Sequence, residues 1–169
     1  MAGADGNNVS YQKTTEPPLR LETYLPYRLN VLADRLTQAL EHLHEQRFGI
    51  GTPEWRVIAA IGQFGTLTAK QVGQHTHMHK TKVSRAVAEL ERRTFIDRRV
   101  NEEDHREAFL SLTAAGQRIY DEIAPLALEF ARRLAEGLDD HEHRALDRAL
   151  AHLTTKTDSL VHELRRFAE

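Results

Sequence analysis

The 169-residue sequence predicts a mainly α-helical fold with a small β-hairpin. Leucines recur every three or four residues over residues 25–43 and again over residues 146–164, which places them on one face of a helix in each segment. Between these segments, residues 96–100 and 108–112 alternate apolar and polar side chains across a short polar loop, a pattern typical of a hairpin. The chain therefore joins long helices to a compact region with two short strands.

The composition excludes several classes of protein. With 40% hydrophobic and 28% charged residues, the chain is long enough to bury a core, and the absence of cysteine excludes disulfides and thiolate chemistry. No apolar run approaches the roughly 20 residues of a membrane span, and the polar start contains no secretory signal. We therefore expect a cytoplasmic protein without a membrane partner.

Residues that typically begin or end helices divide the first half of the chain into a tail and two helices. Residues 1–20 lack apolar periodicity and are expected to be a mobile tail. The helix that follows should end near Gly49, because glycine commonly closes a helix in the left-handed conformation. Thr52 is expected to cap the next helix, with Pro53 in its first turn.

Two shorter helices then precede the hairpin. Thr68 and Gln71 have the spacing of a capping box and should begin a helix that ends near His75. The next helix is expected over residues 80–93, where Val83, Val87 and Leu90 form an apolar stripe. Helices followed by a hairpin in this order predict a winged helix-turn-helix domain over residues 49–113.

The last third of the chain predicts two long helices. Thr113 is expected to cap the first, which carries apolar residues as far as Leu138 and contains a kink at Pro125. Asp139 or Asp140 is expected to cap the second. The second helix spaces its apolar residues like a heptad repeat, interrupted once by Thr157.

Charge is distributed unevenly along the chain. The formal net charge of −2 argues against a nucleic-acid partner when taken alone. Residues 80–99, however, contain seven cations and three acids, whereas the remainder carries a net −6. A solvated helix face is the alternative interpretation, but the capped helix before this segment and the basic hairpin after it favour a DNA-reading surface. The candidate DNA-binding residues here are Lys80, Thr81, Lys82, Ser84, Arg85, Arg98 and Arg99.

Three segments resemble the MarR family of bacterial transcriptional regulators. They are the run from Lys80 to Arg93, the hairpin signature Asp104-His105-Arg106, and the segment LSLTAAG at residues 110–116. The resemblance covers roughly residues 21–165. It implies a homodimer that binds a pseudo-palindromic DNA operator, with Arg106 in the minor groove and Asp104 bracing a basic side chain such as Arg99. His105 joins these DNA-binding candidates.

The resemblance also assigns the long helices to dimerisation. It places residues 21–48 and 114–166 in a helical dimerisation region where the two subunits intertwine. The predicted dimerisation residues are Leu25, Leu146, Leu150, Leu153, Leu160 and Leu164. Two positions depart from the family pattern: His79 replaces a small polar or acidic cap, and Thr94 replaces a glycine after the recognition helix.

A small-molecule effector site is expected between the helical region and the DNA-reading domain. Its candidate residues are Tyr27, Arg28, Phe48 and Trp55, the alternative being that the aromatic rings are core and Arg28 is solvated. Residues 25–30 and 53–58 resemble MarR members that sense aromatic acids or their CoA thioesters. For a CoA ligand, the candidate phosphate-binding cations are Arg20, Arg28, Arg35 and Arg56.

The remaining signals favour neither an enzyme nor a resident metal. His75, His77 and His79 suggest a metal-responsive regulator, but no nearby acid completes a tetrahedral set, so we predict no metal and no cofactor. Ser84 has no evident catalytic base, and no phosphate loop is present, which excludes the common enzyme classes. A winged-helix protein-interaction module is the other alternative. The preferred function is a nucleoid-associated repressor that a phenolic acid or its CoA thioester releases from operator DNA.

Overall fold

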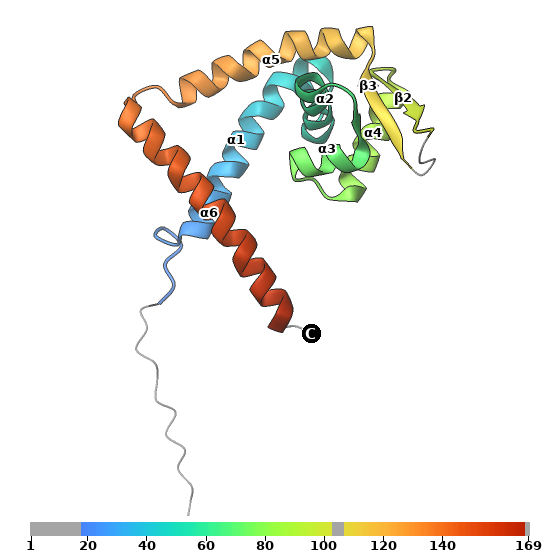
Figure 1. Cartoon of the computed structure of the whole chain (residues 1–169). Helices are drawn as coiled ribbons and strands as arrows, with labels where there is room; N and C mark the ends of the chain where they lie inside the picture. Colours follow the sequence, from blue (N-terminus) through green and yellow to red (C-terminus); the bar gives the residue numbers. More distant parts are fainter. Residues whose placement is uncertain (1–17, 103–106, 168–169) are drawn as a thin grey trace, which may run out of the picture. The chain divides into compact units, whose positions relative to one another are not determined.

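The computed structural model describes residues 18–102 and 107–167 (Figure 1). The chain divides into two compact units, one ending at Ala39 and the other beginning at Leu40. The described part of the first unit is a turn followed by the start of α1 (Leu25–Phe48), on which Leu25, Leu29 and Leu32 are exposed. In the described part of the chain, no helix combines the length and hydropathy that a membrane span requires.

The second unit begins with the end of α1 and with α2 (Thr52–Phe64). Gly49 has a φ of +60°, which confirms it as the left-handed residue that closes α1. The prediction that Thr52 caps α2 is wrong. Gly51 is the N-cap, its carbonyl accepting from the Trp55 amide at 2.9 Å, while the Thr52 hydroxyl donates to the Glu41 carboxylate at 3.1 Å.

The helix-turn-helix pair is α3 (Ala69–Thr76) and α4 (Lys80–Arg92). The predicted capping box is confirmed, because the Thr68 hydroxyl accepts from the Gln71 amide and the Gln71 side chain accepts from the Thr68 amide. His79 is the N-cap of α4, and its Nδ1 accepts from the Thr81 amide at 3.4 Å. This contact lies near the long limit for a hydrogen bond, as expected for an imidazole in place of a short polar cap.

The predicted hairpin is confirmed, and in the structure a third strand pairs with it to form a three-stranded sheet. β2 (Ile96–Val100) pairs antiparallel with β3 (Ala108–Leu112), placing Arg98 opposite Leu110. β1 (Leu67–Thr68) pairs with the other edge of β3, which gives the order β1-β3-β2. Two residues are too short for a periodic signal, which is why β1 was not predicted.

The core lies where α2 packs against α3, α4, α5 and the sheet (Figure 1). The predicted stripe of α4 is confirmed, since Val83, Val87 and Leu90 are each less than 5% exposed. Other fully buried apolar residues come from the loop before α2, from α2 itself, α3, β3 and α5, and include Ile50, Val57, Ile58, Val72, Leu110 and Ile123. α4 is therefore held by a continuous apolar core, which leaves its opposite face to solvent.

The two C-terminal helices are α5 (Ala114–Leu134) and α6 (Asp140–Phe167). Thr113 caps α5 as predicted, its hydroxyl accepting from the Gly116 amide at 3.0 Å, and Pro125 lies inside the helix. The prediction that this helix reaches Leu138 is wrong, because the helix stops at Leu134, before Gly137, whose φ is +94°.

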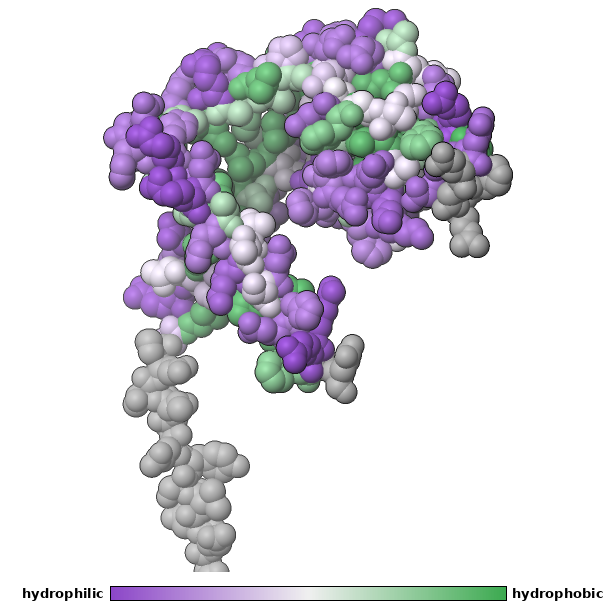
Figure 2. All heavy atoms as spheres, in the orientation of Figure 1, coloured by the Kyte–Doolittle hydropathy of each residue, from purple (hydrophilic) through white to green (hydrophobic). Residues whose placement is uncertain are grey.

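Of the two candidate caps for the last helix, Asp139 is the one used. Its carboxylate accepts from the His141 and Glu142 amides, both at 2.8 Å, and the Glu142 side chain accepts from the Asp139 amide in return. None of the described side chains of α6 is buried. Its leucines are exposed or half-buried, and Figure 2 shows hydrophobic residues at the surface near the end of this helix.

Thr94, which follows α4, carries local backbone strain. Its φ is +57°, a left-handed conformation in which a β-branched residue is strongly disfavoured. Glycine adopts this conformation without penalty, so we expect Thr94→Gly to raise the free energy of unfolding by about 1 kcal/mol. Urea denaturation would measure the change. The matched control is Thr66→Gly at an exposed position where φ is not positive, and it should lower stability. An equal loss of stability in Thr94→Gly and Thr66→Gly would contradict backbone strain at Thr94.

Candidate nucleic-acid interface

The outer face of α4 presents the predicted reading residues. Lys80, Thr81, Lys82, Ser84 and Arg85 are all exposed, whereas the opposite face packs into the core. The small side chains of Ser84 and of the neighbouring exposed alanine allow the helix backbone to approach another surface closely. The helix N-terminus adds its own partial positive charge near Lys80. This face can hold an anion-rich partner against a rigid helix.

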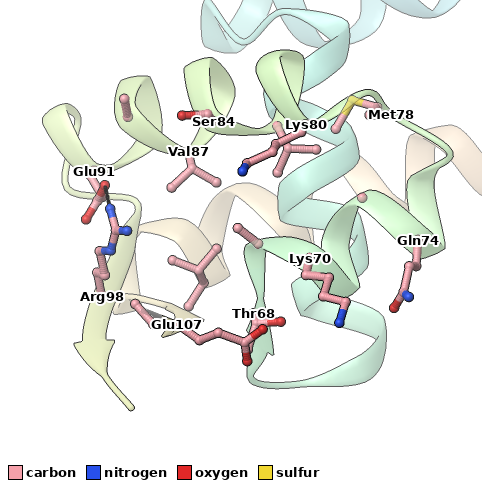
Figure 3. Close-up of a pocket in the computed structure, with 16 residues that line it drawn as sticks. Thr68, Lys70, Gln74, Met78, Lys80, Ser84, Val87, Glu91, Arg98 and Glu107 are labelled. Atoms are coloured by element: carbon pink, nitrogen blue, oxygen red, sulfur yellow. Dashed lines mark ion pairs between the residues drawn. The ribbon is translucent and has the colours of Figure 1, made fainter. Parts of the chain in front are cut away.

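A concavity of about 800 Å³ lies beside this face, between α3, α4 and the sheet. Figure 3 shows Lys80 and Ser84 of α4 along one side, and Lys70 and Gln74 of α3 along another. The cations Lys70, Lys80 and Arg98 line it together with the acids Glu91 and Glu107. Its walls are therefore of mixed charge, with one more cation than acids.

Arg98, one of the two predicted strand arginines, is engaged within the protein. Its guanidinium lies 3.5 Å from the Glu91 carboxylate, so β2 is tied to the end of α4 (Figure 3). Arg99 is the next residue along the strand and therefore points to the other face of the sheet. The sequence analysis counted Glu91 among the acids of this segment but did not predict its ion pair with Arg98. Helical spacing places Glu91 on the same face as Lys80 and Ser84.

The local charge excess is thus only partly available to a partner. Arg92 is paired with Glu89, and its hydrogen bonds and positive charge hold the pKa of the Glu89 carboxyl below its usual value. Arg93 binds backbone carbonyls. Within residues 18–102 and 107–167, the cations of this segment that form neither an ion pair nor a side-chain hydrogen bond are Lys80, Lys82, Arg85 and Arg99. Asp104, His105 and Arg106 lie outside the described residues.

The three neighbouring histidines have separate structural roles. The His75 ring stacks on Phe64 with a centroid distance of 4.0 Å. His77 has a φ of +53° and ends α3, and His79 caps α4. The described residues contain no group of three or more histidines or acids that could hold a metal ion.

The predicted effector residues fall in both units. Tyr27 and Arg28 belong to the first unit and are exposed. Phe48 and Trp55 belong to the second unit, where both are half-buried and pack against the core, and Trp55 stacks on Tyr120 at 6.3 Å. Their contact with the core matches the alternative interpretation for these two rings. The other cations considered for a CoA ligand, Arg20, Arg35 and Arg56, are exposed.

Sequence reasoning did not identify His44 as a buried group. The side chain is 1% exposed, and its Nδ1 donates to the Ile50 carbonyl at 2.6 Å. Within the described residues, its Nε2 has no hydrogen-bond partner. The Ile50 contact fixes the loop that joins α1 to α2.

The helices α2 to α4, the hairpin and the exposed basic helix face define a winged helix-turn-helix domain. Residues 48–107 match the model of the MarR family. This segment is therefore similar to the MarR family, and the relatives and solved structures that the chain resembles are named as transcriptional regulators.

Three relatives illustrate the match. An uncharacterized HTH-type transcriptional regulator of Bacillus subtilis, YwoH, is 28% identical over 98 residues, which cover 58% of this chain and 71% of that protein. A MarR/EmrR family transcriptional regulator from Acinetobacter is 28% identical with a TM-score of 0.77, covering 83% of this chain and 99% of its own. The S. aureus MepR–DNA complex has a TM-score of 0.73 at 20% identity, covering 79% and 98%, and shares the fold.

Proposed function

We propose that this protein is a transcriptional repressor that binds a pseudo-palindromic DNA operator as a homodimer. The observation that carries the proposal is the exposed face of α4, where Lys80, Lys82 and Arg85 have no ion-pair partner among the described residues. Phosphate is the complementary partner for cations on a helix of this kind. The fold likeness to MepR, whose structure contains DNA, supports the same class of partner.

In the proposed complex, α4 enters the major groove. Lys80 and Lys82 contact phosphates, and Arg85 reads a base edge, because its planar guanidinium can donate two parallel hydrogen bonds to guanine. Ser84 lies close to the groove floor. Lys70 on α3 extends the same charged surface beside α4 (Figure 3). Arg99 and the hairpin signature residue Arg106 remain predicted contacts of the wing.

Homodimerisation is proposed from the leucine faces of the long helices. Leu146, Leu150 and Leu160 are each between 45% and 47% exposed, and Leu164 is 68% exposed. Leu25 on α1 is 44% exposed. Because most of these side chains are less than half exposed, burying each against a second copy provides roughly half of the stabilisation, about 1.5–3 kcal/mol, that burial of a fully exposed leucine gives. A two-fold symmetric dimer would place one α4 in each half-site of a palindromic operator.

We further propose that a small aromatic acid or its CoA thioester releases the operator. The residues assigned to this ligand are Tyr27, Arg28, Phe48 and Trp55. In the proposed dimer, one spacing of the two reading domains fits two adjacent major grooves and another does not. The ligand releases DNA only by binding the second arrangement more tightly, and the coupling expected for such regulators is about 1–3 kcal/mol. A thermal-shift screen of phenolic acids and their CoA esters tests this, since a ligand that binds the folded state raises its melting temperature.

Arg85→Ala tests the DNA-reading face. Selection from a random duplex pool supplies the binding sequence, and fluorescence anisotropy measures Kd. We expect the substitution to cost about 1–3 kcal/mol and to relax the preference at one base pair in each half-site. The matched control is Arg148→Ala, an exposed arginine on the side of α6 away from its leucines, which should leave Kd unchanged. An equal loss on every sequence would contradict base reading by Arg85, and a pool without enrichment would contradict the proposed function.

A further inference from the structure

Arg93 at the end of α4 is bound to the end of a different helix. Its guanidinium donates to the Phe48 carbonyl at 2.9 Å and to the Gly49 carbonyl at 2.5 Å. The last carbonyls of a helix lack partners within that helix and carry its negative partial charge. Arg93 therefore caps α1 from a position 44–45 residues later in the chain. Its guanidinium also lies 4.7 Å from the centre of the Phe95 ring.

The two residues after Arg93 are bound to the start of α5. The Thr94 carbonyl accepts from the Thr113 hydroxyl at 2.8 Å, and the Phe95 carbonyl accepts from the Thr113 amide at 3.1 Å. Gly116 packs so closely on Phe95 that an added Cβ would lie 1.9 Å from the carbonyl oxygen. Residues 93–95 form a junction that joins the end of α4 to the end of α1 and the start of α5.

The contacts of Arg93 differ from those of its neighbour. Arg92 is exposed and pairs with Glu89 on its own helix, so its removal leaves the links between helices intact. Arg93 is half-buried, and both terminal nitrogens of its guanidinium are committed to carbonyl oxygens of the protein. Its charge is therefore used inside the protein, unlike that of Arg85.

We propose that Arg93 is a positioning residue that sets the orientation of α4 for sequence-specific DNA binding. The proposal rests on the DNA-binding function proposed above. Its fork-shaped guanidinium holds two carbonyls at once, and a lysine ammonium, a single point charge, cannot reproduce this geometry. Loss of the fork frees the end of α4, so base contacts that need exact placement weaken while phosphate contacts persist. Discrimination between sequences then falls more than affinity for DNA in general.

The test compares Arg93→Ala and Arg93→Lys with Arg92→Ala. Anisotropy gives Kd for the selected duplex and for a scrambled duplex of equal composition, over a salt series, at a temperature where circular dichroism shows each variant folded. We expect the ratio of the two Kd values to fall about threefold to thirtyfold in both Arg93 variants and to stay unchanged in Arg92→Ala. The slope of log K against log salt should remain that of the wild type, because no phosphate contact is lost.

Two results would overturn the positioning role. They are an unchanged ratio of the two Kd values in Arg93→Lys, whatever Arg93→Ala does, and a salt slope reduced by about one in the Arg93 variants. The last result would make Arg93 a phosphate contact. Should Arg93→Ala fail to fold, Arg93→Lys and Phe95→Leu are compared with Arg92→Ala instead. Phe95→Leu removes the ring beside the Arg93 guanidinium. Failure of the proposed function is distinguishable, since the wild-type protein would then prefer neither duplex.

Discussion

Replacement of both Leu153 and Leu160 by aspartate is expected to convert the protein from a dimer into monomers. At 100° per residue, the two leucines lie on the same side of α6, in line with Leu146, Leu150 and Leu164. In a dimer, aspartates there would place unpaired carboxylates in an apolar contact, which costs several kcal/mol. Sedimentation equilibrium measures the change in mass, and far-ultraviolet circular dichroism verifies that the helices remain.

The control for this double substitution is Thr155→Asp with His162→Asp. Both positions are exposed and lie on the opposite side of α6, so the added charge is matched. The control should remain dimeric. A dimeric Leu153→Asp/Leu160→Asp protein would contradict the assignment of this face to dimerisation. Because each monomer carries a single reading helix, the monomeric variant should also lose its preference for palindromic over half-site DNA.

The second large effect is expected from Gly116→Ala in the first turn of α5. Glycine-to-alanine changes inside helices normally stabilise by about 0.5–1 kcal/mol. Here the added Cβ would lie 1.9 Å from the Phe95 oxygen and 2.9 Å from the carbonyl carbon, both backbone atoms that cannot rotate away. We therefore expect the opposite sign, a loss of about 3 kcal/mol in the free energy of unfolding, measured by urea denaturation.

Ala114→Gly in the same turn separates this contact from helix propensity. Ala114 is exposed, so glycine there should cost at most about 1 kcal/mol. A Gly116→Ala protein as stable as the wild type would show that α5 and residue 95 separate easily. That outcome would also contradict the view that the contact between Gly116 and Phe95 helps to hold the end of α4.

Local signals predicted the helices and the hairpin well, because short-range chemistry determines them. The Thr68–Gln71 capping box and the Thr113 cap depend on residues three apart, and both are present. The left-handed conformation of Thr94 falls at the position where the family pattern has glycine. The cap of α2 was mispredicted because the hydroxyl of Thr52 binds Glu41, eleven residues away, a contact that periodicity cannot reveal.

The candidate site was predicted only in part, for a similar reason. The exposed residues of α4 follow from helical spacing once the apolar stripe is known. Tertiary contacts decide which cations remain available: Arg98 lies against Glu91, and Arg93 binds carbonyls of residues 48 and 49. A charge count over residues 80–99 treats all seven cations alike, so it overstates the surface available to phosphate.

The salt dependence of DNA binding tests the central claim most directly. The claim is that the outer face of α4 binds operator DNA, with Lys80 and Lys82 on phosphates and Arg85 on a base edge. The association constant for the selected duplex, measured between about 50 and 200 mM salt, should fall linearly on a log–log plot with a slope of about −0.9 for each phosphate neutralised. A scrambled duplex should bind more weakly with a similar dependence. An association constant that does not change with salt, or that is equal for both duplexes, would contradict the account.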